Sequence, residues 1–508
     1  MKNNLVKKLC AVALAAVMMT GAAASGAVLV NQAALPVYAA SVVSENGFEC
    51  RQVGDDGFLV VKYTGKDTDV VIPETVGGRT VEGINSGAFD GCGFVKSITL
   101  SKTTDFVHSA AFSGCTNLQK ILVDADHPDY ASVKGCLTSK DKKALYACPI
   151  GYRGKFTVPT SIKTIQAFAF ENCTRITEIV VPKGVKTIEA YAFRNCNGLL
   201  KVSIDSGVTF ETWWTGSPTS AFEGCSRLMD IDYHAADGTY DTIDGVLFGD
   251  YYGEKALMLY PQGRKGAYAI PEGTNIIGSE AFYHHKGLTG VTIPNSVRMI
   301  DNYAFCGCEN LTQVTIPKSV QSVGFEAFGK CSNLVSVTFE PGAKLTDGSS
   351  GDAAWHAFDN CPNLRTLKLP KSFTSAESDD NNMVDGSPNV TIYGKKGSFA
   401  EQYAKKYNNP FSTAVPVLKN NASLAQSTVK LGQAVEVLHE GIDGKGPYQY
   451  AVYYKKASSE KWTKAQGYKS DLTTTFTPKA ATKYDVKVLV KDTRGKVIIK
   501  TLSVSVTR

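Results

Sequence analysis

The stretch AFCGCENLTQVTIP (Ala304–Pro317) decides the fold, because AFGKCSNLVSVTFEP (Ala327–Pro341) repeats its pattern 23 residues later. In both copies, apolar residues stand three, six and eight positions after the cysteine at Cys308 or Cys331. The last two are two residues apart, which is the period of a short β-strand with one face turned inward. A proline after the first strand ends it, because proline cannot donate the next ladder hydrogen bond.

The same pattern occurs in nine segments of the chain, each with an Ala-Phe pair at its centre. Successive phenylalanines are 23, 58, 23, 29, 60, 23, 23 and 30 residues apart. One such unit cannot bury its apolar side alone, whereas stacked copies pair their strands in parallel and share a core. The sequence therefore predicts a mainly β solenoid with short helical turns. The phenylalanines are Phe89, Phe112, Phe170, Phe193, Phe222, Phe282, Phe305, Phe328 and Phe358.

The unit AF-x-x-C-x-x-L-x-x-V-x-I-P resembles the BspA-like leucine-rich repeats of bacterial surface proteins. The resemblance covers roughly residues 46–415 and includes a terminal piece, NVTIYGKKGSFAEQYAKKYNNPF, that is similar to the family's closing strand and helix. In that piece Phe399, Tyr403 and Tyr407 are four residues apart, so they share one helical face that can cover the last coil.

The N-terminal segment 1–39 has the composition of a secretory signal peptide. Lys2, Lys7 and Lys8 precede a long apolar stretch, and small residues surround Ala39. Its removal takes away Cys10 and lowers the net charge from +6 to +3, a balance too mild to predict nucleic-acid binding. We expect a secreted chain with no membrane span, either released or held non-covalently at the cell surface.

Eight repeats carry a cysteine at one position, and these equivalent thiols are predicted to form a buried structural column. A catalytic thiol would instead be a lone cysteine activated by a neighbouring base. The column consists of Cys92, Cys115, Cys173, Cys196, Cys225, Cys308, Cys331 and Cys361. In the sixth repeat His285 replaces the cysteine, either as a partly exposed histidine or as a metal ligand beside Cys308. Because four ligands are not evident, we predict no metal site and no cofactor.

Two long gaps between repeats hold related insertions, ASVKGCLTSKDKKALYACPIGYRGKFTVP (131–159) and DTIDGVLFGDYYGEKALMLYPQGRKGAYAIP (241–271). Both are predicted to be β-hairpins that project from the stack. Cys136 and Cys148, on the two arms of the first hairpin, are the best candidates for a disulfide.

Adjacent aromatic residues in the insertions are the candidate ligand contacts. Tyr251 and Tyr252 lie at the predicted tip of the second hairpin, and Trp213 and Trp214 lie in an enlarged repeat. Exposed aromatic side chains anchor protein partners or stack on sugar rings. The alternative is that a tryptophan covers the open core beneath the insertion.

The repeat ends near residue 417, which gives a solenoid over 40–417 and a second domain over 418–508. The second domain alternates short strand patterns with turns, as a β-sandwich does. It resembles the immunoglobulin-like modules that end many bacterial secreted proteins, but it has no cysteine pair. We expect Trp462 to pack in its core.

No motif in the sequence predicts catalysis. There is no His-Glu-x-x-His, Gly-x-Ser-x-Gly, phosphate-binding or dinucleotide-binding pattern. The first hypothesis is therefore a non-enzymatic adhesion protein that binds a host or bacterial protein, which is what the BspA-like resemblance implies. The alternative is a carbohydrate or cell-wall binding protein that uses exposed aromatics. The sequence leaves the oligomeric state open.

Overall fold

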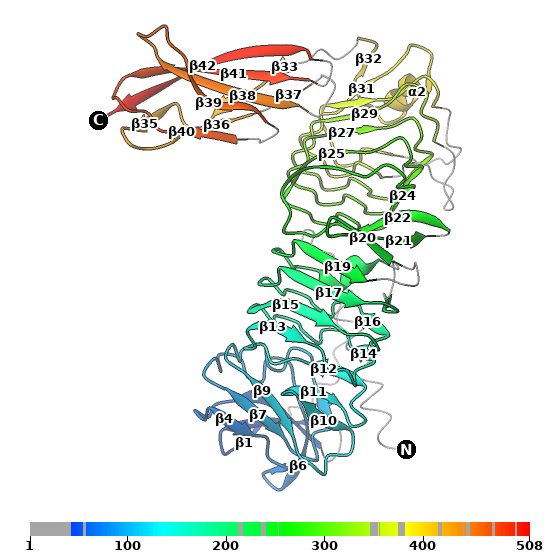
Figure 1. Cartoon of the computed structure of the whole chain (residues 1–508), viewed down its shortest axis with the longest axis vertical. Coiled ribbons are helices and arrows are strands. Elements are labelled where there is room, and N and C mark those ends of the chain that lie inside the picture. The colour runs from blue at the N-terminus through cyan, green and yellow to red at the C-terminus, as the bar shows by residue number, and fades with distance from the viewer. Residues whose placement is uncertain are drawn as a thin grey trace. The chain divides into compact units, whose positions relative to one another are not determined.

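The computed structural model in Figure 1 describes residues 42–53, 57–211, 217–234, 240–251, 253–345, 354, 356–373, 382–414, 419–439, 441–442, 448–469, 473–492 and 495–508. Contacts divide the chain into two units, Met1–Val42 and Val43–Arg508. Almost all of the first unit, including the predicted signal peptide, lies outside the described residues. The description below therefore concerns the second unit.

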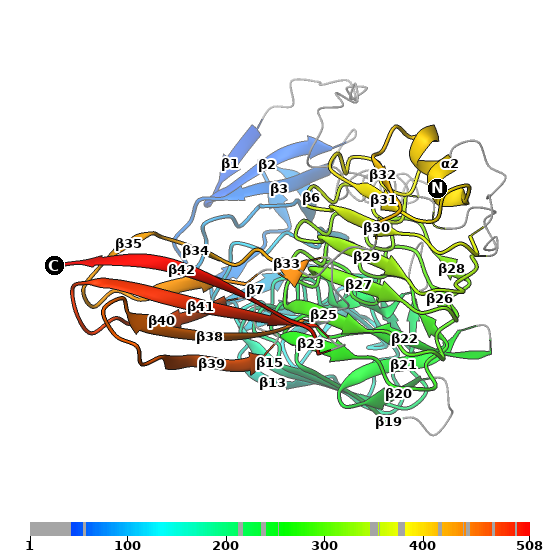
Figure 2. The same cartoon turned by 90° about the horizontal axis from the view of Figure 1, so that it is seen from above.

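Parallel strands, one from each coil, form a ladder along the repeats that we call the long-strand row. Val314 and Ile316 of one such strand are 3% and 0% exposed, which is the alternation expected of a one-sided strand. Figure 2 shows β27, β29, β30, β31 and β32 as neighbouring strands of this row. The row comprises β4 (Asp69–Val71), β7 (Ser97–Leu100) and β9 (Lys120–Val123); β13 (Gly154–Thr157), β15 (Ile176–Val181), β17 (Lys201–Asp205) and β19 (Asp230–His234); β23 (Gly266–Ala269) and β25 (Leu288–Thr292); and β27 (Gln313–Ile316), β29 (Ser336–Phe339), β30 (Thr366–Lys368), β31 (Thr391–Tyr393) and β32 (Phe411–Ser412).

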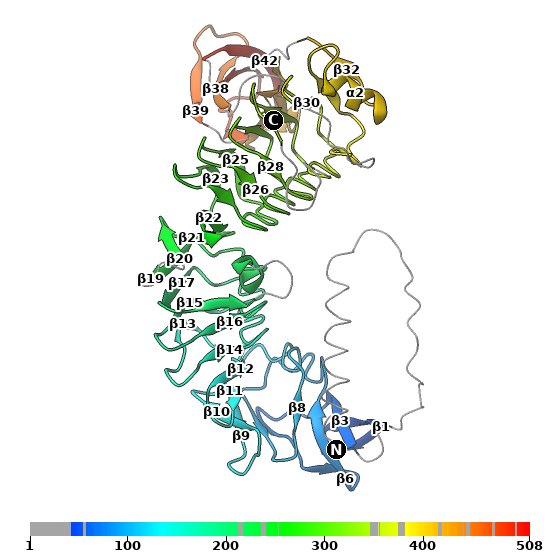
Figure 3. The ribbon, with the colours of Figure 1, turned by 90° about the vertical axis from the view of Figure 1, so that its right-hand side faces the viewer.

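A second ladder, the short-strand row, comes from the Val-x-x-Ile step of each repeat. Figure 3 shows its strands β14 and β16 in neighbouring coils of the stack. The solenoid of stacked parallel strands is confirmed. The short-strand row comprises β6 (Arg79–Ile84) and β8 (Phe106–Val107); β14 (Thr164–Ile165), β16 (Thr187–Glu189) and β18 (Thr209–Glu211); and β24 (Ile276–Ile277), β26 (Met299–Ile300) and β28 (Ser322–Val323).

At the N-terminal end, the first sheet begins with an antiparallel pair, β2 (Phe48–Val53) and β3 (Gly57–Tyr63), and β3 joins the solenoid by pairing with β6. The same sheet also contains β1 (Val42–Glu45) and β5 (Thr75–Val76). One short 3-10 helix, η1 (Pro218–Phe222), replaces a turn in the middle of the stack. At the C-terminal end, helix α2 (Phe399–Lys406) packs Ala400 and Tyr403 onto the last coils, in the place expected for the closing helix.

The Ala-Phe phenylalanines stack in the core between the two rows. Phe305 lies 4.6 Å from Phe282 and 4.8 Å from Phe328 between ring centroids, with nearly parallel planes. Each ring therefore packs between its neighbours, so every coil completes the core of the next one.

The two insertions are hairpins, but they lie within the stack. Their strands are β10 (Tyr130–Val133), β11 (Cys136–Ser139) and β12 (Ala144–Ala147), and β20 (Tyr240–Ile243), β21 (Val246–Tyr251) and β22 (Glu254–Leu259). Strand β12 pairs in parallel with β14, and β22 pairs with β24, so each hairpin continues the short-strand row. The prediction that they project from the stack is wrong, because both of their faces carry apolar residues that the core buries.

The hairpins also divide the core into three apolar clusters. Leu247 belongs to the middle cluster, whereas its neighbours Val246 and Phe248 belong to the C-terminal cluster. In the first hairpin Leu137 belongs to the N-terminal cluster and Leu145 to the middle one. Alternate residues of a strand point to opposite faces, so each hairpin is a layer between two parts of the core.

Residues 419–508 form mainly antiparallel sheets, in which only β35 (Thr428–Lys430) and β42 (Val497–Thr507) pair in parallel among the described strands, and they have their own apolar cluster. Val437 of one sheet and Val452 and Val486 of another meet in it, and all three are fully buried. The immunoglobulin-like classification stays a prediction. The sheets are β33 (Lys419–Asn420) with β37 (Gly441–Ile442); β34 (Ser423–Leu424), β36 (Val435–Leu438) and β40 (Thr473–Phe476); and β35 (Thr428–Lys430), β42 (Val497–Thr507), β41 (Lys483–Lys491), β38 (Gln449–Lys456) and β39 (Thr463–Lys469).

Trp462 does not pack in this core. Its side chain is half-buried, and the ammonium of Lys487 lies 4.1 Å from the centre of its ring, with that of Lys455 at 5.4 Å. The prediction of a core tryptophan is wrong, because the ring is held by two cations on the outer side of a sheet.

Candidate functional site

The outer face of the long-strand row is a regular surface of the solenoid, and its first half carries ion pairs. Lys155 is paired with Glu178 at 2.8 Å, and Lys201 with Asp230 at 2.9 Å and Asp232 at 3.1 Å. These residues are register neighbours on β13, β15, β17 and β19, so opposite charges alternate from strand to strand. The acidic and basic side chains of this half therefore compensate one another.

The second half of the same face carries hydroxyl groups instead. Thr315 of β27, Thr338 of β29, Lys368 of β30, Tyr393 of β31 and Ser412 of β32 lie in one register row. Their side chains are half-buried and point away from the core, because the alternating residues between them are buried. We call this set the hydroxyl row.

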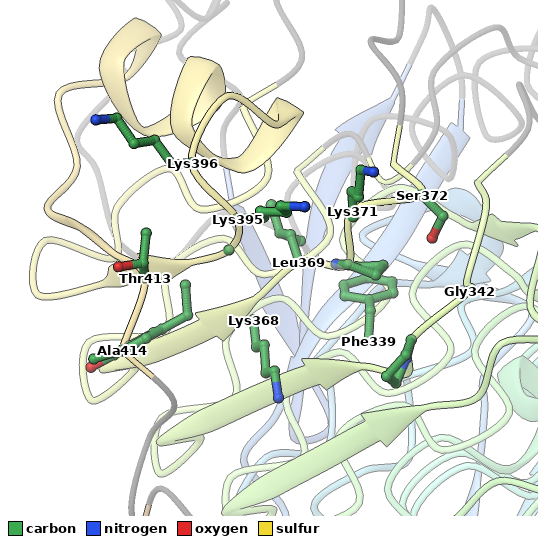
Figure 4. A pocket seen from close by; sticks show the side chains of 14 residues that line it. Phe339, Gly342, Lys368, Leu369, Lys371, Ser372, Lys395, Lys396, Thr413 and Ala414 are labelled. Carbon is green, nitrogen blue, oxygen red and sulfur yellow. The ribbon is translucent and has the colours of Figure 1, made fainter.

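The hydroxyl row leads into a pocket of about 890 Å³ at the C-terminal end of the solenoid, which we call the lysine pocket. Phe339 and Leu369, which are 1% and 2% exposed, belong to its wall together with Tyr393. Figure 4 shows Lys368, Lys371, Lys395 and Lys396 distributed around Leu369. The remaining lining residues are Pro341, Gly342, Pro370, Ser372, Gly394, Thr413 and Ala414.

The lining of the lysine pocket contains four cations and no acid. Lys368 ends β30 and Lys371 follows in the next turn, while Lys395 and Lys396 precede α2. Among the described residues, none of the four lysines takes part in an ion pair, whereas Lys155 and Lys201 on the same sheet face do. The pocket therefore has a positive charge that the described part of the protein leaves uncompensated.

Of the four predicted ligand-binding aromatics, only Tyr251 is among the described residues, and it does not line this pocket. Trp213, Trp214 and Tyr252 lie outside the described residues. Tyr251 lies beside the turn of the second hairpin, half-buried, and its hydroxyl donates a hydrogen bond of 2.8 Å to a carboxylate oxygen of Asp301. A role for these four residues in ligand binding stays a prediction.

The eight cysteines of the column lie in the buried core of successive coils and are at most 3% exposed. Five of their thiols donate to the carbonyl of the phenylalanine one coil earlier over 3.0 to 3.3 Å, from Cys196, Cys225, Cys308, Cys331 and Cys361. Ser387 occupies the next position with the same bond, 3.0 Å to Phe358. Burial raises the pKa of Cys115 to about 12 and also raises that of Cys92, Cys196, Cys308, Cys331 and Cys361, so these six thiols are poor nucleophiles.

His285 takes the place of a cysteine in this column and is fully buried. Its Nε2 lies 3.0 Å from the carbonyl of Pro261, and its ring is 4.9 Å from that of Tyr260. Cys308 directs its thiol to Phe282, away from a shared site. The expectation of a partly exposed histidine is wrong, because the repeat places this position in the core. Burial lowers the pKa of His285.

Cys136 and Cys148 are both buried free thiols in the structure. Burial first, and then a hydrogen bond with Cys136, raise the pKa of Cys148. Their pairing as a disulfide stays a prediction, as does the lack of a cofactor.

One group in the described part of the chain has the residue types of a metal site. His356, Asp359 and Asp385 have ligand atoms within 4.8 Å of one another. Nδ1 of His356 is already bonded to the carboxylate of Asp359, and burial raises the pKa of Asp359 to about 6. Because His356 is bound to one carboxylate oxygen of Asp359 and Asp385 is exposed, the contact that the structure shows in this cluster is a histidine–carboxylate pair, with the other carboxylate oxygen of Asp359 buried.

Part of the lysine pocket can be recognised in the sequence. A lysine follows the strand-ending proline in three repeats, at Lys183, Lys318 and Lys371. Lys368 belongs to the same coil as Lys371, whereas Lys395 and Lys396 come from the next coil, so their presence in one pocket depends on how the repeats stack. A single repeat read alone shows only one exposed lysine.

These features define a solenoid of leucine-rich repeats with an exposed sheet face. The sequence matches the BspA type leucine rich repeat region in six copies, over residues 66–148, 138–248 and 267–382, which is more than half of the chain. The chain therefore belongs to the BspA-type leucine-rich repeat family. Leucine-rich repeat proteins are generally non-catalytic scaffolds that bind other proteins.

Solved structures show similar arrangements. A leucine-rich cell surface protein from Faecalibacterium prausnitzii shares 21% identity over 70% of this chain and 89% of that one, with a TM-score of 0.38. The pneumococcal vaccine antigen PcpA shares 18% identity over 74% and 99%, with a TM-score of 0.43. A leucine-rich repeat protein from Eubacterium ventriosum shares 16% over 69% and 85%, with a TM-score of 0.34.

A comparison with curated proteins gives no match. In the described ranges, no helix combines the length and the apolar character needed to cross a bilayer.

Proposed function

We propose that the protein is a secreted or surface-held adhesion protein that binds another macromolecule through the outer face of its long-strand row, without catalysis. The observation that carries this proposal is the contrast between the two halves of that face. The first half pairs its own charges, whereas the second half offers half-buried hydroxyls beside a pocket whose lysines form no ion pair with any residue that the structure describes. An open, regular face without self-paired charge supports binding of an extended partner.

Bulky substitutions on the two halves test this proposal. Thr315→Arg with Thr338→Arg places large side chains on the hydroxyl row, and Thr157→Arg with Thr177→Arg does the same on the first half, where both threonines are exposed. Binding of the mature chain to immobilised matrix proteins and to bacterial cells is then measured. We expect the first pair to weaken binding at least tenfold and the second pair to leave it within twofold. Equal losses would contradict the assignment of the face.

Carbohydrate binding is the second candidate function, and the apolar wall of the lysine pocket favours it. Aromatic and apolar side chains such as Tyr393 and Leu369 can pack against the C–H faces of sugar rings. Glycan-array binding of the Trp213→Ala/Trp214→Ala variant, which lacks two of the aromatics predicted from the sequence, is compared with that of the Tyr393→Ala variant. Loss of signal only in the tryptophan variant would place the glycan site at the enlarged repeat instead.

A further inference from the structure

We propose that the lysine pocket binds a sulfated polysaccharide, with sugar rings on its apolar wall and sulfate groups on its four lysines. This inference rests on the proposed function, because it names a ligand class for the same face of the solenoid. Three features of the pocket carry it: its charge, the type of its cations and its continuity with the hydroxyl row.

The charge of the pocket is opposite to that of the solenoid around it. Residues 40–418 contain 35 basic and 41 acidic residues, a net charge of −6. The pocket nevertheless gathers four lysines and no acid in its lining. A concave surface with one sign of charge concentrates the field and attracts ligands of the opposite sign. The positive charge is therefore local, which points to a polyanion bound at this place.

The four cations of the lining are all lysines, and lysine ammonium groups bind tetrahedral oxyanions such as sulfate and phosphate. An arginine fork matches planar carboxylates and phosphates through two parallel hydrogen bonds, whereas a lysine ammonium acts as a point charge with three donors. Four point charges suit groups whose negative charge is spread over several oxygens and repeated along a chain. Sulfate groups on a polysaccharide meet both conditions.

The neutral part of the surface favours a sugar polymer over an acidic peptide. Thr315 and Thr338 continue the register of Lys368 and Tyr393, so two threonines on adjacent strands, about 4.8 Å apart, lead up to the lysine. Hydroxyls exchange hydrogen bonds with the many hydroxyls of a linear glycan. Half-buried Tyr393 and exposed Pro341 in the pocket lining provide the apolar contact for a sugar ring.

The test compares two variants of the mature chain with the same change in charge. The pocket variant is Lys368→Gln/Lys371→Gln/Lys395→Gln/Lys396→Gln. The control variant changes four exposed lysines of the C-terminal segment, Lys464, Lys479, Lys483 and Lys496, to glutamine. The control is demanding, because residues 419–508 contain 16 basic and 7 acidic residues and would dominate any binding that followed net charge alone.

Binding to immobilised heparin at 150 mM salt is measured by surface plasmon resonance, with circular dichroism as the check on folding. We expect the pocket variant to lose at least tenfold in affinity and the control variant less than threefold. We also expect Tyr393→Ala to weaken binding severalfold without changing its salt dependence. Equal losses in the two lysine variants, or a larger loss in the control, would overturn the pocket as the site.

Other polyanions decide the ligand class. Hyaluronan, which carries carboxylates only, polyglutamate and polyglycerol phosphate are tested on the same surface at equal charge concentration. We expect each to bind at least fivefold more weakly than heparin, and equal binding by any of them would overturn the sulfated class. If the pocket variant loses heparin binding but still adheres to cells, the pocket does not mediate adhesion, while the proposed function stands. If Thr315→Arg/Thr338→Arg leaves adhesion intact, the proposed function itself fails.

Discussion

At the scale of single residues, one position in each coil holds the stack together. The side chain there lies in the core and bonds to a carbonyl one coil earlier: Cys196 and Ser387 reach the carbonyl of a phenylalanine, and His285 reaches that of Pro261. The residue before it adopts a left-handed conformation, with φ of 56° at Asn195 and 72° at Gly307. Glycine and asparagine tolerate this conformation best, so they are suitable residues for the turn. The position therefore requires a small polar group more than it requires a thiol.

Histidine at this position is predicted to make the fold sensitive to acid. Burial lowers the pKa of His285 below its ordinary value of 6.5, so the unfolded chain binds a proton that the folded chain resists. Stability from this residue is therefore present above pH 6.5 and is lost as the pH falls below it.

We expect His285→Cys, which restores the repeat, to reduce the loss of unfolding free energy between pH 7 and pH 5 by on the order of 1 kcal/mol. Chemical denaturation at several pH values measures this difference. His108 and His284 also have pKa values lowered by burial and remain in the variant, so some acid sensitivity persists. Identical pH profiles for parent and variant would contradict the buried position of His285.

The thiols of the column are predicted to be unreactive in the folded protein. Burial raises the pKa of Cys361 to about 12 and that of Cys331 well above its ordinary value, so the thiolate is scarce at pH 8. We expect an aromatic disulfide reagent to react with few thiols of the native chain and with twelve after denaturation. Ten thiols after denaturation would instead show that Cys136 and Cys148 form the predicted disulfide.

At the scale of elements, the hairpins are the features that differ most from the sequence prediction. Their turns and strand patterns were visible in the sequence, and so were the repeats. What could not be seen was the pairing of Leu145 with Ile165 and of Leu257 with Ile277, because these contacts join segments about 20 residues apart. The lysine pocket escaped prediction for the same reason, since its cations come from two coils. Trp462 was misplaced because a two-residue period does not say which face of a strand is buried.

The two faces of the second hairpin are predicted to stabilise different parts of the solenoid. Leu247 contributes to the middle cluster and Phe248 to the C-terminal cluster, and both are fully buried. Each substitution to alanine should cost about 3 kcal/mol from lost burial and the cavity left behind. In a repeat array such a cost falls mainly on the neighbouring coils.

Hydrogen exchange with mass spectrometry resolves the two effects. We expect Leu247→Ala to speed exchange in β17 and β19, and Phe248→Ala to speed it in β24 and β26. Asp241→Ala, on an exposed position of the same hairpin, is the control and should leave both regions unchanged. If both core variants loosened the same strands, the division of the core by the hairpin would be wrong.

At the scale of the whole molecule, charge and apolar contacts change together near residue 418. The preceding segment 40–418 has a net charge of −6, whereas residues 419–508 have a net charge of +9. The apolar clusters of the solenoid draw their residues from positions up to Phe411, and those of the C-terminal segment from Ala422 onward. Within the described part, each segment therefore has a core of its own, which is the physical requirement for a domain.

We therefore expect the segments 40–417 and 418–508 to fold separately. Produced alone, each should unfold cooperatively in a calorimeter, because no cluster in the described residues needs side chains from the other segment. The solenoid fragment should keep its heparin affinity within threefold if the lysine pocket is the site, since all of its lining residues precede position 415. The melting profile of the full chain should then equal the sum of the two fragments. A fragment that remains unfolded, or a single transition of the full chain absent from both fragments, would show that the boundary at residue 418 is wrong.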